Sequence, residues 1–193
     1  MATESKHRGL IIALAGLLLL QIAGAAIWYK WLRHDTQDSS GVIPRMQEFT
    51  RERRYDEAAQ IGQKSLNNTS ADDAVLQQIA LVYLRRAQIE AGDKAQFTTQ
   101  AVEYSEKALT ANPANQMDFY ATARVLDIAG DYSAQLRCEH YKRSVSLFEK
   151  RTQFLTGESL EVDGKAVPTE RLRQENDYLL ERVKTKMAKT GCG

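Results

Sequence analysis

Residues 101–132, AVEYSEKALTANPANQMDFYATARVLDIAGDY, carry the pattern that decides the fold. Small and apolar side chains recur here every three or four residues, which is the period of one face of an α-helix. Because proline cannot continue a helix, Asn112-Pro113 ends the first helical stretch. A second stripe, which contains Phe119 and Leu126, leads to a predicted turn at Gly130-Asp131-Tyr132. This segment therefore predicts two amphipathic helices in succession.

The same pattern recurs on both sides, with a period near 34 residues, although the middle unit is about nine residues longer. Each unit has two apolar stripes separated by a short turn, and the middle unit turns at Ala91-Gly92-Asp93. No such unit buries its stripes alone, so we expect the units to stack around one continuous core. The stripes comprise Val42, Met46, Phe49, Tyr55, Ala58 and Leu66, then Leu76, Ile79, Ala80, Tyr83, Phe97, Ala101, Tyr104, Ala108 and Leu109, and finally Phe119, Ala123, Leu126, Ala134, Cys138, Tyr141, Val145 and Phe148.

The ending ALTANP (Ala108–Pro113) and the GDY sequence (Gly130–Tyr132) resemble the consensus of the tetratricopeptide repeat family, and the resemblance covers residues 39–150. It implies an all-α fold in which helix–turn–helix units stack into a solenoid. The sequence departs from the family pattern at Ser70, where a proline is usual, and at Gln135, where a small residue is usual. The alternative is a plain helical bundle without a concave groove.

Two further elements are expected after the repeats. Residues Ser159–Val167, SLEVDGKAV, alternate around Asp163-Gly164, which is typical of a β-hairpin within a connecting segment over 151–168. Pro168 and Thr169 open a helix over 169–189, and its apolar face would cap the last repeat. Residues 190–193 are expected to form a loose tail.

The N-terminal segment predicts a membrane anchor. Residues 9–29, GLIIALAGLLLLQIAGAAIWY, carry no charge and would form a helix about 30 Å long, the thickness of a hydrocarbon core. A cleaved signal peptide is the alternative, because Ala23-Gly24-Ala25 resembles a cleavage site. With an anchor, residues 1–8 form a short tail and residues 30–41 a linker to the repeats over 42–150.

The charges around this segment bear on its orientation. Lys6 and Arg8 precede it, and Lys30 and Arg33 follow it, so the positive-inside rule discriminates little. Because a short basic tail before a single anchor usually stays in the cytoplasm, we expect the large domain on the far side. The prediction is a single-pass membrane protein with a periplasmic or lumenal domain.

The sequence carries no pattern that indicates an enzyme. It contains no GxGxxG, GxxxxGK[ST], HExxH or GxSxG motif, so we expect no catalytic residues and no cofactor. Cys138 and His140 lack the further ligands of a zinc site, so no metal is expected. Cys138 lies on an apolar stripe and is expected to be a buried structural thiol. Cys138 and Cys192 could also form a single disulfide. With 26 Lys and Arg against 25 Asp and Glu, the chain lacks the basic surplus of a nucleic-acid binder.

The resemblance implies that the first helix of each unit lines a concave groove. Arg51, Arg85 and Arg124 would each lie on it, and the planar fork of an arginine binds a carboxylate through two hydrogen bonds. We therefore expect the groove to bind an acidic or C-terminal peptide segment, with a solvated basic face as the alternative. The groove residues expected from helical position are Gln47, Arg51, Gln77, Leu81, Leu84, Arg85, Tyr120, Arg124, Asp127 and Ile128.

Together these features predict a membrane-anchored protein–protein interaction module. It would act as a scaffold, an assembly factor or an accessory subunit of a membrane complex, with the lipid bilayer and a nearby protein as its partners. A tether raises the local concentration of the domain near such a partner. The alternatives are a membrane-tethered chaperone with broad client binding and, after signal cleavage, a secreted helical-repeat protein.

Overall fold

A computed structural model of the chain describes residues 39–66, 72–162 and 165–192. Within these residues the fold consists of seven helices and one two-stranded antiparallel sheet, so the expected all-α class is confirmed. The predicted transmembrane helix over 9–29, the tail over 1–8 and most of the linker lie outside the described residues. Within the described part of the chain, no helix is both long and apolar enough to cross a membrane.

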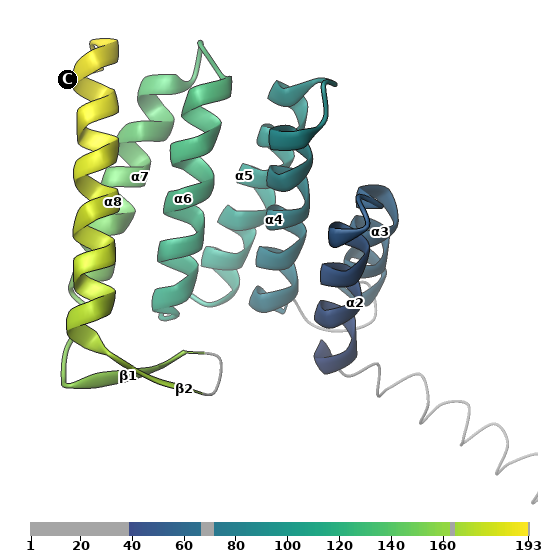
Figure 1. The fold of residues 1–193 in the computed structure, drawn as a ribbon, viewed down its shortest axis with the longest axis horizontal. Coiled ribbons are helices and arrows are strands. Elements are labelled where there is room, and N and C mark those ends of the chain that lie inside the picture. Colours follow the sequence, from purple (N-terminus) through teal and green to yellow (C-terminus); the bar gives the residue numbers. More distant parts are fainter. Residues whose placement is uncertain (1–38, 67–71, 163–164, 193) are drawn as a thin grey trace, which may run out of the picture. The chain divides into compact units, whose positions relative to one another are not determined.

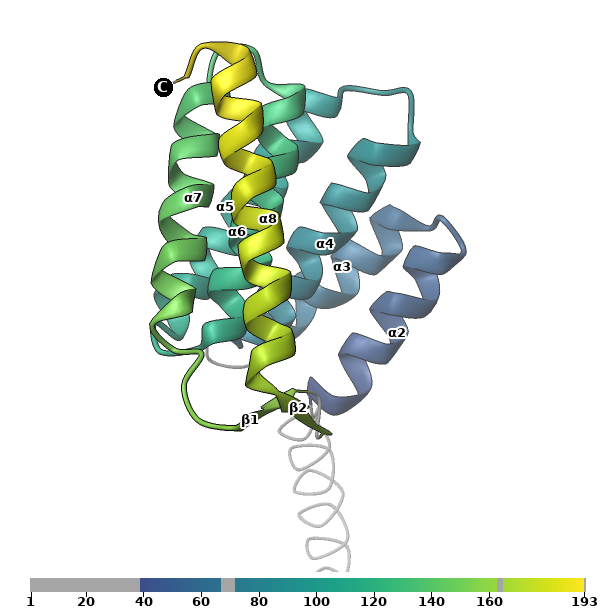
Figure 2. The ribbon, with the colours of Figure 1, turned by 60° about the vertical axis from the view of Figure 1, so that its left-hand side comes forward.

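Six helices follow one another as three pairs, and a seventh helix follows the sheet (Figure 1). Neighbouring helices pack together throughout, and the first helices of successive pairs also touch, α2 against α4 and α4 against α6. Helix α8 packs on α7 and runs beside it in both views (Figure 2). The elements are α2 (Ser39–Arg51), α3 (Tyr55–Leu66), α4 (Asp73–Ile89), α5 (Lys94–Ala111), α6 (Gln116–Tyr132), α7 (Arg137–Thr152), β1 (Ser159–Val162), β2 (Lys165–Pro168) and α8 (Thr169–Thr190).

Short polar side chains set several helix starts. Asp72 accepts hydrogen bonds from the main-chain N–H groups of the first turn of α4, and Asp93 and Asn115 do the same for α5 and α6. Helix α5 ends at Ala111, immediately before Asn112 and Pro113, as the sequence predicts. These local signals explain why the boundaries of the middle pair were predictable.

Two predicted boundaries are wrong. Helix α2 begins at Ser39, so the last three residues of the predicted linker are helical. Gly130 is not in a turn, because α6 continues to Tyr132. A Cβ atom at Gly130 would lie 2.3 Å from Cε1 of Tyr141, so glycine is needed there for the close approach of α7 to α6.

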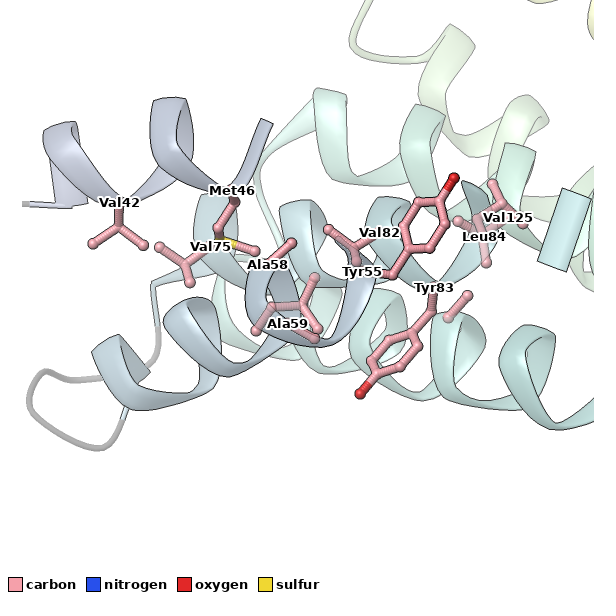
Figure 3. Packing of buried hydrophobic residues seen from close by; sticks show 12 residues of the cluster. Val42, Met46, Tyr55, Ala58, Ala59, Val75, Val82, Tyr83, Leu84 and Val125 are labelled. Carbon is pink, nitrogen blue, oxygen red and sulfur yellow. The ribbon is translucent and has the colours of Figure 1, made fainter. Parts of the chain in front are cut away.

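Two clusters of buried side chains form the core. The first joins α2, α3, α4 and α5 with Val125 of α6, and Figure 3 shows its side chains meeting between the helices. Met46 and Ile79 are fully buried in it. The second joins Leu109 of α5 to α6, α7 and α8 through residues such as Phe148 and Val183. Since each cluster draws on more than one helix pair, the pairs depend on their neighbours for burial.

The hairpin prediction is confirmed. Strands β1 and β2 pair antiparallel, with Leu160 opposite Val167. Asp163 and Gly164, between the strands, lie outside the described residues. The main-chain N–H of Thr169 donates to the carbonyl of Glu158 over 3.0 Å, which ties the start of α8 to the hairpin.

The predictions for the two cysteines are wrong. Cys138 is exposed at the start of α7 and forms a disulfide with Cys192, 54 residues further along the chain. Residue Cys192 is only 2% exposed, so the predicted loose tail is instead packed and covalently attached. Gly191 has a φ of 69°, a left-handed conformation that ends α8 and turns the chain toward α7.

Candidate partner-binding groove

The first helices of the pairs line a pocket of about 430 Å³, which we call the groove. Helix α2 contributes a single lining residue, and α4 and α6 contribute the rest. The lining is Thr50, Gln78, Leu81, Leu84, Arg85, Gln88, Met117, Tyr120, Ala121, Arg124 and Ile128. Its mixture of apolar side chains and two arginines is typical of a site that binds a partly apolar, negatively charged group.

Most of the predicted positions lie in or beside this groove. Six of them line it: Leu81, Leu84, Arg85, Tyr120, Arg124 and Ile128. Gln47 and Arg51 are exposed on α2 next to it, and Nε2 of Gln47 donates to Oε1 of the lining residue Gln78 over 3.5 Å. That a partner binds these residues stays a prediction.

Gln77 and Asp127 do not belong to the groove surface. Gln77 is 7% exposed, and its Nε2 donates to Oγ1 of Thr122 over 3.1 Å, which joins α4 to α6. Asp127 is fully buried and accepts hydrogen bonds from Arg182 and, over 2.8 Å, from Lys186. Both positions face a neighbouring helix, so their roles are structural and their assignment to the groove surface was wrong.

The groove arginines differ from a paired arginine beside them. The exposed side chain of Arg85 makes no hydrogen bond or ion pair within the described part of the chain. The adjacent Arg86 is bonded to Asp56 and to Glu90, each over 2.6 Å. Because the described residues supply carboxylates to Arg86 and none to Arg85, the charge of Arg85 is left open to a ligand among these residues.

Tyr120 joins the groove to the C-terminal helices. Its hydroxyl donates to Oε1 of Glu175 on α8, and Nη1 of Arg124 lies 3.4 Å from the same hydroxyl. The guanidinium of Arg151 lies 4.2 Å from the centre of the ring, at a cation–π distance. Burial, and then the hydrogen bond to Glu175, raise the pKa of Tyr120, so its hydroxyl keeps its proton near neutral pH.

Arg151 is a buried cation behind the groove. It is 1% exposed, and its Nη1 lies 3.4 Å from Oδ1 of Asn176 on α8. The amide of Asn176 in turn donates to the carbonyl of Phe148 over 3.0 Å, which fixes α8 against α7. Burial lowers the pKa of Arg151, and electrostatic interactions with Tyr120 and then with Glu175 partly oppose this effect. Glu175 therefore acts electrostatically on both Tyr120 and Arg151.

The sequence did not predict a pair of carboxyl groups in the first turns of α4 and α6. Asp118 is 2% exposed, and burial together with the neighbouring Asp73 raises its pKa to about 7. Partial burial raises the pKa of Asp73, but hydrogen bonds from Asn115 and Asn112 outweigh that effect and lower it overall. The pair thus holds a proton on Asp118 at mildly acid pH, at the contact between α4 and α6.

The two adjacent acids at the start of α4 have different roles. Asp72 caps α4. Asp73 instead turns to the α5–α6 connection, where its Oδ2 lies 2.9 Å from Nδ2 of both Asn112 and Asn115. Only the packing of α4 beside α6 reveals this contact.

The described residues contain no cluster of three or more His, Cys, Asp or Glu side chains that could hold a metal ion. No protein-family model and no curated protein matches the chain. Among the described residues, the groove on α4 and α6 combines an apolar lining with two arginines, which suits a ligand that is partly apolar and negatively charged.

Proposed function

We propose that this chain is a membrane-anchored protein–protein interaction module whose groove binds a carboxylate-bearing segment of a partner protein. Residues 9–29 would hold it in the bilayer, and the helical domain would act as a scaffold, an assembly factor or an accessory subunit of a membrane complex. The observation that carries the proposal is an apolar groove whose Arg85 has no partner within the described residues.

The packing of the groove supports a peptide rather than a small polar ligand. Leu81 lines the groove and is 43% exposed, an unusually large exposure for a leucine of the middle helix pair. A partner side chain that covers Leu81 would remove apolar surface from water, while Arg85 and Arg124 orient a carboxylate. Apolar anchors beside oriented charges are typical of peptide-binding sites.

The arrangement of the helices supports a tetratricopeptide-like stack as the finer description of the fold. Three helix pairs follow one another, and the first helix of each pair touches the first helix of the next. The lining of the groove comes from these first helices alone. This matches what the family resemblance implies for a concave binding surface.

The disulfide supports the proposed side of the membrane. Bridges such as Cys138–Cys192 persist in oxidising compartments and are rare in the cytosol. A periplasmic or lumenal domain, with the N-terminal tail in the cytoplasm, is consistent with this bridge. Trapping of the free thiols in intact cells tests it, because a cytoplasmic domain would leave both thiols reactive.

Photo-crosslinking in native membranes tests the groove directly. A photoreactive amino acid replaces Leu81 in the groove, and the matched control replaces Thr99, which is exposed on the second helix α5. We expect the probe at position 81 to attach to one protein at a fixed ratio and the probe at position 99 to attach to none. Equal attachment from both positions would contradict a groove-specific partner.

The same experiment separates the main alternative. A tethered chaperone would give many crosslinked clients from position 81, without a fixed stoichiometry. The exposure of Leu81 is the observation that favours this second reading. Identification of the attached proteins by mass spectrometry decides between one partner and many clients.

A further inference from the structure

The two arginines of the groove stand in different electrostatic surroundings. Arg85 faces no carboxylate within the described residues, whereas Arg124 shares the Tyr120 hydroxyl with Glu175. Glu175 is exposed on α8, which packs against α7 and reaches α6 through side-chain hydrogen bonds. One side of the groove is therefore positively charged, and the other carries an arginine that is partly neutralised by an acid of the chain itself.

Several contacts fix Glu175 in this position. The buried Asn176, its neighbour in sequence, bonds to the carbonyl of Phe148 and to Thr152 of α7, each over 3.0 Å. Further along α8, Arg182 donates a hydrogen bond to the buried Asp127. The carboxylate of Glu175 is thus held by a rigid helix rather than by a mobile loop.

A fixed carboxylate beside a groove discriminates between ligands by charge. A second acidic side chain of a bound segment would meet Glu175 at the Tyr120 side, and juxtaposed like charges disfavour binding. A lysine or arginine of the segment at the same place would be attracted to Glu175. This attraction acts over less than the Debye length of about 8 Å at physiological salt, so salt screens it only partly. The Arg85 side retains its preference for a carboxylate.

Resting on the proposed function, we propose that Glu175 is a specificity-determining residue of the groove. It selects a partner segment that places an acidic side chain at Arg85 and a basic side chain at Tyr120, and it rejects segments that are acidic throughout. The geometric basis is the chain of contacts from Arg124 through Tyr120 to Glu175.

A peptide selection tests this inference. The probe is a displayed library of random dodecapeptides, selected on the full-length protein in detergent micelles. We expect the wild-type protein to enrich peptides that carry one acidic and one basic residue. The variant Glu175→Gln keeps a side-chain oxygen for the Tyr120 hydroxyl but loses the charge, so it should enrich peptides with two acidic residues.

Affinities then quantify the selection. An enriched peptide is synthesised with its basic residue and with glutamate in its place, and both dissociation constants are measured by fluorescence anisotropy. We expect the wild-type protein to bind the glutamate peptide about three to five times more weakly, as for exposed charge pairs, and Glu175→Gln to bind both peptides within about twofold. The variant Arg124→Gln should increase the preference for the basic peptide.

The matched control is Glu181→Gln. Glu181 lies on the same helix and is exposed, and its one ion pair among the described residues is with Lys184, over 3.8 Å. The same change of charge there should leave the wild-type preference intact. Circular dichroism verifies that each variant is folded. Enrichment of the same peptides by the wild-type protein and Glu175→Gln would overturn the role of Glu175 but not the groove function. Failure of the wild-type protein to enrich any peptide would overturn the groove function as well.

Discussion

Helix α6 faces α8 on one side and α4 on another, and these two regions differ in whether charged side chains are paired within the described residues. On the side of α8, the buried Asp127 binds Arg182 and Lys186, and Asp131 binds Lys186 over 2.7 Å. On the side of α4, the groove opens and Arg85 has no acidic partner within the described residues. We call these the closed contact and the open contact.

The difference indicates which charges serve stability and which remain for a ligand. At the closed contact, acids on one helix neutralise bases on the other, and the Cys138–Cys192 bridge secures the same end of the domain. At the open contact, the chain leaves arginines beside exposed apolar surface. Changes at the closed contact should therefore alter stability, and changes at the open contact should alter binding.

Removal of the disulfide should have the largest effect on stability. The bridge closes a loop of 54 residues, for which the chain-entropy model gives up to about 4 kcal/mol. The variant Cys138→Ser/Cys192→Ser should lose about that much free energy of unfolding in urea titrations. Wild-type protein reduced with dithiothreitol serves as the second measurement and should unfold at the same lower urea concentration. An unchanged midpoint in both would show that the bridge does not secure α8.

Asp127→Asn should have the next largest effect. The substitution removes the buried acceptor of Arg182 and Lys186, whose side chains are partly exposed and regain some solvation. We expect the free energy of unfolding to fall by about 1–3 kcal/mol. The control Asp177→Asn changes an exposed acid on α8 and should stay within about 0.5 kcal/mol of wild type. Equal effects of the two substitutions would contradict the closed contact.

Asp118→Asn should change how the free energy of unfolding depends on pH. Asp118 lies at the contact between α4 and α6. Burial and the neighbouring Asp73 raise the pKa of Asp118 from 3.8 to about 7, so the folded state holds a proton that the unfolded state releases. The wild type should therefore lose stability, relative to the variant, as pH rises from about 4 to about 7, and the difference should be constant above that. We expect the variant to be more stable at pH 8 by roughly 1–3 kcal/mol.

The lowered pKa of Asp73 acts in the opposite direction, because its contribution is present at neutral pH and is lost as the solution becomes more acidic than about pH 4. Urea titrations of both proteins between pH 4 and pH 8 measure the difference. Parallel curves for the wild type and Asp118→Asn across this range would show that Asp118 does not titrate there.

The two adjacent arginines of α4 give the smallest and most specific comparison. Arg86→Gln loses ion pairs with Asp56 and Glu90 and the contact with Phe97, and should cost about 1 kcal/mol of stability. Arg85→Gln loses no hydrogen bond, ion pair or ring contact with the described residues and should stay within about 0.5 kcal/mol of wild type. Thermal unfolding of the two variants side by side checks the order, and a reversed order would contradict it.

The sequence predicted the helices and the hairpin because their signals are local. A proline such as Pro113 cannot continue a helix, and Asp93 caps the first turn of α5. Thr169 begins α8 directly after a hairpin whose residues alternate between apolar and polar. Helical period places Leu81 and Arg85 on one face of α4, and the family resemblance implied that this face lines the groove. These features need no knowledge of which helices meet.

The features that the sequence predicted wrongly or did not predict all depend on contacts between segments that are distant in the sequence. Asp127 has the helical phase of a groove residue, and only the docking of α8 buries it. The bridge from Cys138 depends on α8 running back along α7, which no local pattern encodes. Gly130 reads as a turn residue, but Tyr141 of the next helix explains it. The Asp73–Asp118 pair likewise requires α4 beside α6.

Partner recovery with the open contact reversed in charge tests the central claim most directly. Full-length wild type and Arg85→Glu/Arg124→Glu are extracted from membranes with mild detergent, and the copurified protein is quantified. Lys64→Glu/Lys142→Glu is the control, because it changes the charge equally on α3 and α7, away from the groove. We predict that the groove variant recovers about tenfold less partner and that the control recovers as much as the wild type. Equal recovery by all three proteins would contradict binding through the groove.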